Sequence, residues 1–498
     1  MIKILNSQQI KSLDAYTIEQ EPILSIKLME RACHAFVTWF MEKFDTTNSV
    51  GVVCGTGNNG GDGLGIARLL NEWGYSVKVW IVKGSATETE DFKKNLSRIT
   101  DKIETFEITT AADQGLFTNC GIIIDAIFGS GLSRPPEGIY AQAVNCINKT
   151  KAVRIAVDVP SGLMIDSHST GPIVNAHHTI TFQLPKLAFL LPENLVYVGK
   201  WHVLDIGLSK NFMKEVETNH YYITTKAIKK KLKPLSKFDH KGDNGKALLI
   251  AGSYGKMGAC VLASKACLRS GIGLVTVHVP RSGNVVVQTA VPEAMTLIDA
   301  DETHFTSFTD LTGFDVIGIG PGIGMESKTR DAFAAVIELA KPMIIDADGL
   351  NILAAHPDLL TKIPLGSILT PHPKEFERLV GSWKNDFERL EKQKQLSSLA
   401  NVIVVLKGAH TSITSPDGKV YFNSTGNPGM AKGGSGDVLT GILTGLLGQR
   451  YSALDAALMG VFVHGLAGDF AAREKGMHSL IASDLIEFLP QAFKSLAS

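Results

Sequence analysis

Short apolar runs alternate with helical stretches along nearly the whole chain, and this alternation limits the fold more than any other feature. In the first half, apolar runs at residues 49–54, 77–82, 122–124, 152–157 and 179–182 predict buried strands, and residues 64–73 predict a helix between the first two. Strands that alternate with helices form parallel sheets whose faces the helices cover. We therefore expect a three-layer α/β domain.

A basic, polar stretch separates this pattern from a second one. Seven lysines lie between residues 226 and 241, around Pro234, which puts the domain boundary near residue 215 and predicts domains at residues 1–215 and 225–498. Further strands are predicted at residues 247–251, 273–279, 315–319, 343–345, 367–369 and 402–406. Residues 412–414 and 420–422 flank a Pro-Asp-Gly turn and predict a hairpin. The second half is expected to be another α/β domain.

Composition excludes several classes of protein. The 498 residues carry 49 basic and 49 acidic side chains, so the chain lacks the overall positive charge of a nucleic-acid binder. Its six cysteines form no CxxC pair, which indicates buried thiols in a reducing compartment. No run approaches the ~20 apolar residues that cross a bilayer, and the N-terminus offers no signal peptide. A cytoplasmic protein without nucleic-acid or membrane partners is expected.

A glycine-rich loop follows the first predicted strand. Residues 55–60 fit the GxGxxG pattern of a Rossmann-like domain, in which a pyrophosphate binds at a helix N-terminus. The next strand ends at Lys83, however, where a dinucleotide site would place an acidic residue. Asn58, Asn59 and Asp62 supply oxygens that suit a hydroxyl group or a cation at least as well. A glycine turn without a ligand is the remaining alternative.

Two further strand ends carry carboxylates close to glycine. Asp125 precedes the loop at residues 128–135, and Asp158 precedes the Pro160-Ser161-Gly162 turn. Ligands of open parallel sheets bind beyond the carboxyl ends of the strands, so these loops are expected to share one cleft with the glycine loop. Each carboxylate taken alone could instead cap a helix or a turn.

Residues 57–63, 125–129 and 158–162 together resemble the NAD(P)H-hydrate epimerase family, over residues 1–215. The resemblance implies interconversion of the R and S forms of NADH or NADPH hydrated at C6 of the nicotinamide ring. It implies that Asp158 is the acid/base residue and that Asn59, Asp125 and Ser161 bind a potassium ion. The substrate-binding residues that it implies, besides Asp158, are Asn58, Asn59, Gly60, Gly61, Asp62, Gly129, Ser130, Gly131, Leu132, Ser133, Arg134, Pro135 and Tyr140.

A second glycine-rich segment, at residues 427–437, leads directly into an apolar helical stripe. Backbone N–H groups at a helix N-terminus suit a phosphoryl group, and Asp437 stands where it can take a proton from an attacking hydroxyl. Capping of the helix is the alternative role for Asp437. Gly441 and Gly445 in the stripe indicate close helix packing. Gly-x-Gly-Asp in this setting resembles the ribokinase-like superfamily.

Further motifs narrow this resemblance, over residues 225–498, to the ADP/ATP-dependent NAD(P)H-hydrate dehydratase family. They lie at residues 241–246, 252–259, 320–324, 346–351, 370–375 and 406–411. The resemblance implies that Asp437 is the catalytic base, that Mg²⁺ accompanies ADP, and that Ala251, Gly322, His372 and Asp437 contact the hydrated nucleotide. The adenine nucleotide would contact Lys407, Gly408, Ala409, His410, Thr411 and Gly436. His372 could instead be a buried turn histidine.

Together the two resemblances imply a repair enzyme for hydrated NADH and NADPH. Phosphorylation of the C6 hydroxyl would replace a poor leaving group, hydroxide, with a good one, phosphate. Fusion of both activities in one chain resembles the bacterial and archaeal arrangement, whose dehydratase prefers ADP, and the family suggests a homo-oligomer. Two alternatives are a ribokinase-like small-molecule kinase fused to a nucleotide-binding module and a nucleotide-sensing scaffold without catalysis.

Overall fold

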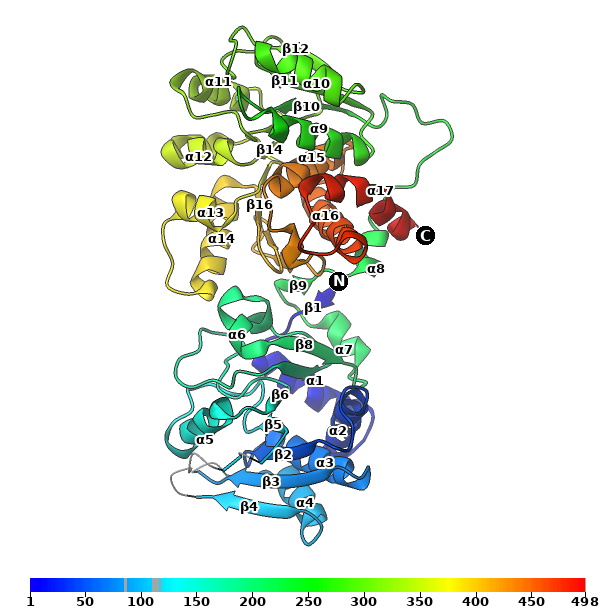
Figure 1. Cartoon of the computed structure of the whole chain (residues 1–498), viewed down its shortest axis with the longest axis vertical. Coiled ribbons are helices and arrows are strands. Elements are labelled where there is room, and N and C mark those ends of the chain that lie inside the picture. Colours follow the sequence, from blue (N-terminus) through cyan, green and yellow to red (C-terminus); the bar gives the residue numbers. More distant parts are fainter. Residues whose placement is uncertain (85–86, 110–115, 118, 498) are drawn as a thin grey trace. The chain divides into compact units, whose positions relative to one another are not determined.

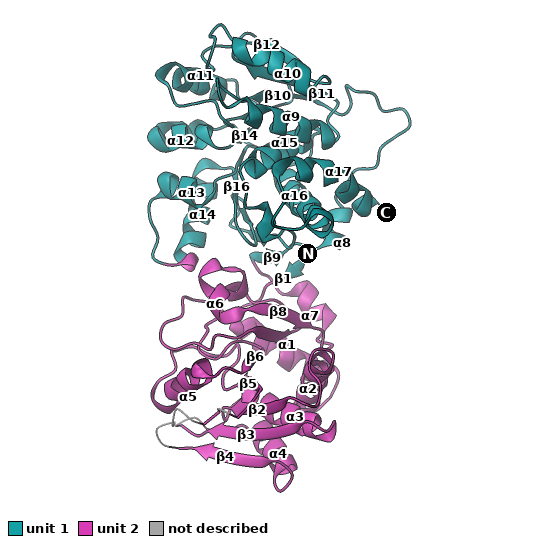
Figure 2. Ribbon diagram, viewed as in Figure 1, with its two compact units in different colours: residues 1–2, 219–384, 388–498 teal, residues 3–218, 385–387 magenta. Residues whose placement is uncertain are grey.

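The computed structural model describes residues 1–84, 87–109, 116–117 and 119–497. These residues form two compact units (Figure 2). The N-terminal unit comprises residues 3–218 and 385–387, and the C-terminal unit comprises residues 1–2, 219–384 and 388–498. Residues 216–224, between the two predicted domains, contain β9 (His220–Tyr222), a strand of the C-terminal sheet.

A parallel sheet forms the centre of the N-terminal unit. Within the described residues it has seven strands, in the order β4-β3-β2-β5-β6-β7-β8. Their bounds are β2 (Ser49–Cys54), β3 (Ser76–Val82), β4 (Glu104–Ile108), β5 (Ile122–Ala126), β6 (Val153–Val157), β7 (His178–Phe182) and β8 (Lys200–Leu204). All five predicted strands are confirmed. Strands β4 and β8 were not predicted, because these edge strands are mostly exposed or half-buried and form no apolar run.

Two apolar cores, one on each face of this sheet, confirm the three-layer expectation (Figure 1). Val52 and Cys54 point into the core beneath α2 (Ser25–Met41), α3 (Asn58–Glu72) and α4 (Glu90–Ile99). Val53, the residue between them, points into the opposite core beneath α5 (Gly138–Lys149). The other helices are α1 (Ser7–Gln20), η1 (Leu187–Leu190), η2 (Pro192–Asn194), α6 (Leu195–Val198) and α7 (Lys210–Glu215).

The glycine loop is shorter than predicted, because α3 begins at Asn58 and not near residue 64. The first turns of α3 press directly on the strand ends. A Cβ atom on Gly60 would lie 1.8 Å from the Gly55 carbonyl oxygen, and one on Gly63 would lie 2.5 Å from the Ala126 Cβ. Only glycine permits this approach. Asn58, Asn59 and Asp62 consequently project from a helix and not from a loop.

A larger sheet forms the centre of the C-terminal unit. Within the described residues it has eleven strands, in the order β1-β9-β18-β17-β16-β15-β14-β13-β10-β11-β12. Their bounds, besides β9, are β1 (Ile2–Lys3), β10 (Lys246–Ile250), β11 (Leu274–Val279), β12 (Met295–Ile298), β13 (Val316–Ile319), β14 (Met343–Ile345), β15 (Ile368–Leu369), β16 (Ile403–Leu406), β17 (Ser412–Thr414) and β18 (Val420–Phe422). The predicted hairpin is confirmed as antiparallel β17 and β18. Strands β1, β9 and β12 of this sheet were not predicted, and β12 is an edge strand with exposed ends.

Helices cover both faces of this sheet as well. Leu249 of β10 packs in the core with α9 (Met257–Arg269), α15 (Ser435–Gly448), α16 (Ala453–Lys475) and α17 (Ala482–Ala497), whereas its neighbour Leu248 packs in the opposite core. That opposite core includes α11 (Ser327–Ile337), α12 (Asp348–Ala355), α13 (Pro373–Val380) and α14 (Asp386–Ala400). The remaining helices are α8 (Thr225–Lys229), η3 (Arg281–Gly283), α10 (Asn284–Ala290), η4 (Pro357–Lys362) and η5 (Pro428–Met430).

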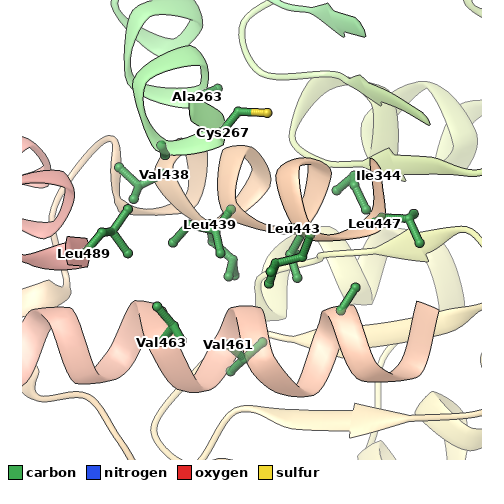
Figure 3. Packing of buried hydrophobic residues seen from close by; sticks show 14 of the residues in the cluster. Ala263, Cys267, Ile344, Val438, Leu439, Leu443, Leu447, Val461, Val463 and Leu489 are labelled. Carbon is green, nitrogen blue, oxygen red and sulfur yellow. The ribbon is translucent and has the colours of Figure 1, made fainter. Parts of the chain in front are cut away.

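Helix α15 lies at the centre of the C-terminal core (Figure 3). A Cβ atom on Gly441 would lie 2.1 Å from the Ala263 carbonyl oxygen, and one on Gly445 would lie 2.8 Å from that of Cys267, so α9 packs backbone to backbone on α15. This confirms the predicted close packing. Among the described residues one helix, α16, has the length and composition of a membrane span, and 67% of its apolar window is buried in the protein.

Substitution of Gly441 by alanine is expected to destabilise the C-terminal unit by about 1–3 kcal/mol, because the added methyl group overpacks the α9–α15 contact. Gly258→Ala on α9 is the matched control: its Cβ meets no atom within 4 Å, so the helix gains alanine's higher propensity. Urea unfolding of both variants measures the difference. Equal transition midpoints for Gly441→Ala and the unmodified chain would contradict the packing argument.

Candidate active sites

A cavity of about 670 Å³ opens at the carboxyl ends of the strands in the N-terminal unit. Most of the predicted substrate-binding residues line it: Asn58, Asn59, Asp62, Gly129, Ser130, Gly131, Leu132, Ser133, Arg134, Tyr140 and Asp158. Gly60 and Gly61, in the first turn of α3, instead pack against the Gly55 backbone and the Met29 side chain. They and Pro135 are not part of the cavity lining. The cleft predicted from separate strand ends therefore exists within one unit.

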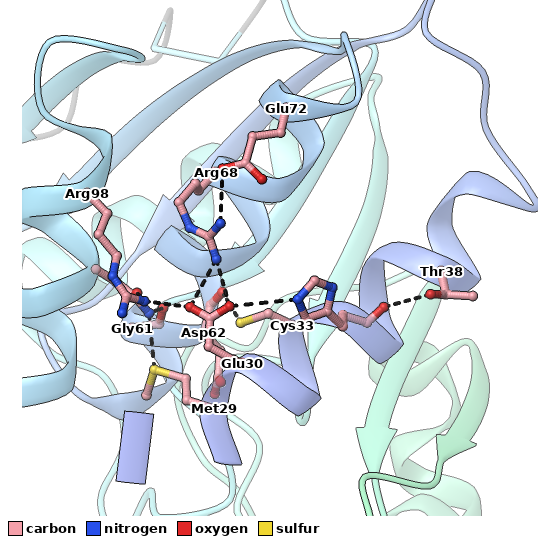
Figure 4. A network of polar contacts seen from close by, with 11 residues as sticks. Met29, Glu30, Cys33, Thr38, Gly61, Asp62, Arg68, Glu72 and Arg98 are labelled. Atoms are coloured by element: carbon pink, nitrogen blue, oxygen red, sulfur yellow. Dashed lines mark hydrogen bonds and ion pairs between the residues drawn. The ribbon is translucent and has the colours of Figure 1, made fainter. Parts of the chain in front are cut away.

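A polar network holds the first turns of α3 at this cavity (Figure 4). The Asn95 amide of α4 donates a 2.9 Å hydrogen bond to the Gly61 carbonyl oxygen, and the Cys33 thiol of α2 lies 3.4 Å from that of Asp62. Glu30 of α2 forms ion pairs with Arg68 of α3 and Arg98 of α4. Three helices are thus tied together where α3 presents its polar side chains.

Asp158 is held in a strained backbone conformation by an ion pair and hydrogen bonds. Its φ is +62°, and its carboxylate accepts from the Thr181 hydroxyl at 2.9 Å and the Ser130 N–H at 3.2 Å. The Lys186 ammonium, only 1% exposed, lies 3.1 Å from the same carboxylate. Burial alone would raise the pKa of Asp158, but Lys186 and these donors outweigh it and the pKa falls below its ordinary value.

Two other carboxyl groups in the cavity shift in the opposite direction. Burial raises the pKa of Asp14 on α1 to about 6, with the charge of Asp158 adding to the effect. Burial also raises the pKa of Asp62 well above its ordinary value, again with a contribution from Asp158. One cavity therefore contains an ionised carboxylate beside carboxyl groups that favour the protonated form.

Two of the three predicted cation ligands, Asp125 and Ser161, are in direct contact. Asp125 is fully buried and accepts from the Ser161 hydroxyl at 2.6 Å and from the Ser161 N–H at 2.8 Å. Burial raises its pKa to about 6 although these hydrogen bonds oppose the shift. The Asn59 side-chain nitrogen is buried and has no hydrogen-bond partner among the described residues. Within the described chain, no group of three or more His, Cys, Asp or Glu side chains could hold a metal ion.

The C-terminal unit gathers its predicted residues at the carboxyl ends of five adjacent strands. Ala251 follows β10, Gly322 follows β13, His372 follows β15 and Lys407 follows β16, with Asp346 at the end of β14 between them. The Ser253 hydroxyl donates to the Gly322 carbonyl oxygen at 2.7 Å, which joins the first two ends. The Lys407 N–H donates to the Pro371 carbonyl oxygen at 2.9 Å, which joins the last two.

Asp437 lies in the first turn of α15, close to this row. A Cβ atom on the adjacent Gly436 would lie 3.4 Å from the Lys407 ammonium and 3.7 Å from the Asp346 carboxylate. Lys407 and Asp346 form a 2.8 Å ion pair, and Thr440 of α15 donates to Asp346 at 2.7 Å. Burial, followed by the charge of Asp346, raises the pKa of Asp437 to about 6, while Lys407 opposes the shift.

The predicted histidines have structural contacts. His372 caps α13, since its Nδ1 accepts from the N–H groups of Lys374 and Glu375, and its side chain is 45% exposed rather than buried. His410 Nδ1 lies 3.2 Å from the Asn423 carbonyl oxygen. In the same loop the Thr411 hydroxyl donates to the Gly408 carbonyl oxygen at 2.9 Å. This loop, which includes Ala409, follows β16 directly.

Three parts of the candidate sites were not found from the sequence. Asp14 and its neighbours come from α1, which carries no motif, and Lys186 lies beyond the last predicted strand of its half. Asp346 lies in a motif used for the resemblance, but its ion pair with Lys407 joins residues 61 positions apart. No local pattern signals such a contact.

Two family models match separate parts of the chain. Residues 25–188 match the family model for the YjeF-related protein N-terminus, and residues 247–491 match that for NAD(P)H-hydrate dehydratase. A ribokinase-like superfamily protein from Enterococcus faecalis V583 is 25% identical with a TM-score of 0.50, over 57% of this chain and 98% of that one.

Two curated relatives match both halves. The bifunctional NAD(P)H-hydrate repair enzyme Nnr of Moorella thermoacetica is 35% identical over 99% of this chain and 97% of its own length. Its namesake from Escherichia coli K12 is also 35% identical, over 88% of this chain and 84% of its own length. The chain therefore belongs to the family of bifunctional NAD(P)H-hydrate repair enzymes.

Proposed function

We propose that this chain repairs hydrated NADH and NADPH by two reactions in two separate pockets. The N-terminal unit interconverts the R and S forms, and the C-terminal unit dehydrates the S form with ADP. The observation that carries this proposal is that each predicted set of site residues falls within one unit, Asp158 with its cavity in the first and Asp437 with Lys407 in the second. The six free cysteines, five of them buried, support a reducing compartment such as the cytoplasm.

Dehydration begins with proton transfer to Asp437. The carboxylate takes the proton of the C6 hydroxyl, whose oxygen attacks the terminal phosphoryl group of ADP, and AMP leaves as the bond between the bridging oxygen and the transferred phosphoryl group breaks. The N–H groups at the start of α15 and the Lys407 ammonium stabilise the charge that develops on the phosphoryl oxygens. The phosphate then leaves from C6 with the help of the N1 electron pair, and loss of a proton from C5 restores the double bond of NAD(P)H.

The proposed ligand-binding residues of the C-terminal unit form two sets, one for the hydrated nucleotide and one for the adenine nucleotide. Ala251, Gly322 and His372 are assigned to the hydrated nucleotide, and the 407–411 loop with Gly436 to the adenine nucleotide. Mg²⁺ bound through nucleotide phosphates needs one or two protein carboxylates, and Asp346 and Glu375 beside Lys407 fit that need. When bound, the ion neutralises phosphate charge.

Epimerisation uses the ionised carboxylate of Asp158. It takes the proton of the C6 hydroxyl when the ring opens at the C6–N1 bond, or the proton of water when a hydroxyl group returns to C6 after dehydration. Lys186 supports this role because it keeps the carboxylate charged. The residues of α3 and of the 129–135 loop hold the nucleotide beside it.

The buried polar residues behind the cavity fit a monovalent cation. Asp125 supplies one charge, and the hydroxyl oxygen of Ser161 and the side-chain oxygen of Asn59 are the neutral ligands. One carboxylate among neutral oxygens suits weakly hydrated potassium better than Mg²⁺, which demands compact octahedral geometry. When bound, the ion would order the loop that carries Gly129, which adjoins Asn59.

The proposed function is tested by incubating hydrated NADH with the chain and ADP or ATP, and following the absorbance of NADH. Full recovery from a mixture of R and S substrate requires both activities. Consumption of ADP with a small alcohol such as a hydroxymethylpyrimidine, and no recovery of NADH, would favour the kinase alternative. Binding of hydrated NADH without turnover would favour the scaffold.

Asp437→Ala is expected to lower nucleotide-dependent dehydration by at least about 10³-fold, because the proton acceptor for the C6 hydroxyl is lost. Interconversion of R and S substrate, measured by chromatography of the two forms, should stay within twofold of the unmodified chain. Asp158→Ala is the reciprocal variant and should show the opposite pattern. Loss of both activities in either variant would disprove two independent sites.

Dehydration is also expected to depend on pH through Asp437. A base must be ionised to act, so kcat/KM for the S substrate should rise with pH up to about 6 and level off above it. Stopped-flow measurement of kcat/KM between pH 4.5 and 8, at constant ionic strength, shows whether the value rises and then levels off. A rate that falls as pH rises through this window would rule out a carboxylate base.

Asp125→Asn is expected to weaken potassium binding and to raise the potassium concentration for half-maximal epimerase activity at least ~10-fold, because the only charged ligand is lost. Dehydration of pure S substrate should stay near normal. Crystals grown in potassium should show an anomalous signal beside Asp125. Ordinary water at that position, with no anomalous signal, would count decisively against the cation.

A further inference from the structure

Helix α1 forms one wall of the cavity in the N-terminal unit. Ile10, Asp14 and Ile18 line the cavity at intervals of four residues, with Lys11 and Ala15 beside them. Only Leu13 and Thr17 of this helix are buried in the protein, whereas five other residues of the helix line the cavity. The helix thus brings one carboxyl group, that of Asp14, to the same space as Asp158.

The carboxyl group of Asp14 is free of contacts that would fix its protonation. It forms no hydrogen bond or ion pair with any other described residue, whereas Asp158 has three donors. It is half-buried and faces the cavity. The charged and titratable groups that surround the same space are Lys11, Asp62, Arg134, Tyr140, Asp158 and Lys186.

We propose that Asp14 is a second catalytic residue, the general acid that works with Asp158 during epimerisation. This inference rests on the proposed function of the N-terminal unit. The substrate and its epimer have the same number of protons, so every proton that is removed must be replaced. Both routes from R to S remove a proton at one atom and add a proton at another, which calls for one group that takes a proton and one that gives it. A single ionised carboxylate cannot do both at once.

Asp158 and Asp14 together account for every proton that moves. On ring opening, Asp158 takes the hydroxyl proton, the C6–N1 electron pair moves to N1, and Asp14 protonates N1 to give an aldehyde and an enamine. After rotation about the C5–C6 bond, N1 attacks the other face of the aldehyde. The N1 proton then returns to Asp14 and the proton on Asp158 returns to oxygen, so no co-reactant is needed.

The electrostatics of the cavity support this pairing. A general acid works best when its pKa lies near the working pH, and the pKa of Asp14 is raised to about 6 by burial and by Asp158. Asp62 lines the same cavity and burial also raises its pKa, so it is the competing candidate and its variant belongs in the test. The fixed charge of Lys186 keeps Asp158 as the base.

The test compares Asp14→Asn with Glu19→Gln, the same chemical change at an exposed position of α1 outside the cavity. Asp14→Asn should lower kcat for epimerisation by about 10²–10³-fold with KM changed less than threefold. The unmodified chain should lose epimerase rate as pH rises above about 6, because Asp14 loses its proton, and this falling limb should be absent in Asp14→Asn. Glu19→Gln should keep the rate and the limb.

Asp14→Glu separates chemistry from structure, since it keeps an acid at the position and should retain the falling limb, displaced along the pH axis. A limb that survives in Asp14→Asn, or that disappears in Asp62→Asn alone, overturns the proposal. An unmodified chain that does not interconvert R and S substrate disproves the proposed function instead. Dehydration of pure S substrate reports in every variant that the chain has folded.

Discussion

Close approach of a helix to its neighbours through glycine is the constraint on which both candidate sites depend. In the N-terminal unit, Gly60 and Gly63 let α3 press on the ends of β2 and β5. In the C-terminal unit, Gly441 and Gly445 let α15 lie against the backbone of α9. A side chain at any of these positions would push the helix away and move the polar groups of its first turns. The glycines therefore fix the position of Asp62 and of Asp437 relative to the strand ends.

The fold was predictable because its strands are apolar runs bounded by turn residues. The central strands were found from this pattern, and the two cores beside each sheet confirm it. The missed strands β4, β8 and β12 lie at sheet edges, where one face or both meet solvent and the apolar signal disappears. The missed strands β1 and β9 are only two and three residues long, and none of their residues is fully buried. The start of α3 was missed for another reason. Glycine disfavours a helix, so its four glycines argue against one, but the close packing of Gly60 and Gly63 on the strand ends requires glycine there.

The sites were predictable only where a motif carries several functional residues in a row. Residues 57–63 and 427–437 each carry several candidate site residues within one short segment, so the motif identifies them together even where the helix start was misplaced, as at α3. The partners of the carboxylates are different. Lys186 reaches Asp158 from beyond the following strand, and Asp346 meets Lys407 across two strand ends. These contacts depend on strand order, which a sequence pattern does not give.

The pKa values of the two proposed catalytic carboxylates shift in opposite directions, although each carboxylate is buried and has a lysine nearby. Lys186 is fully buried against Asp158 and lowers its pKa, whereas Lys407 is engaged by Asp346 and leaves Asp437 with a raised pKa. The difference suits the two proposed reactions. In dehydration the hydroxyl oxygen gives its proton to one base and takes a phosphoryl group in its place. A single carboxylate therefore suffices. Epimerisation regenerates the same functional group and must return every proton, which requires a base and an acid that remain distinct within one cavity.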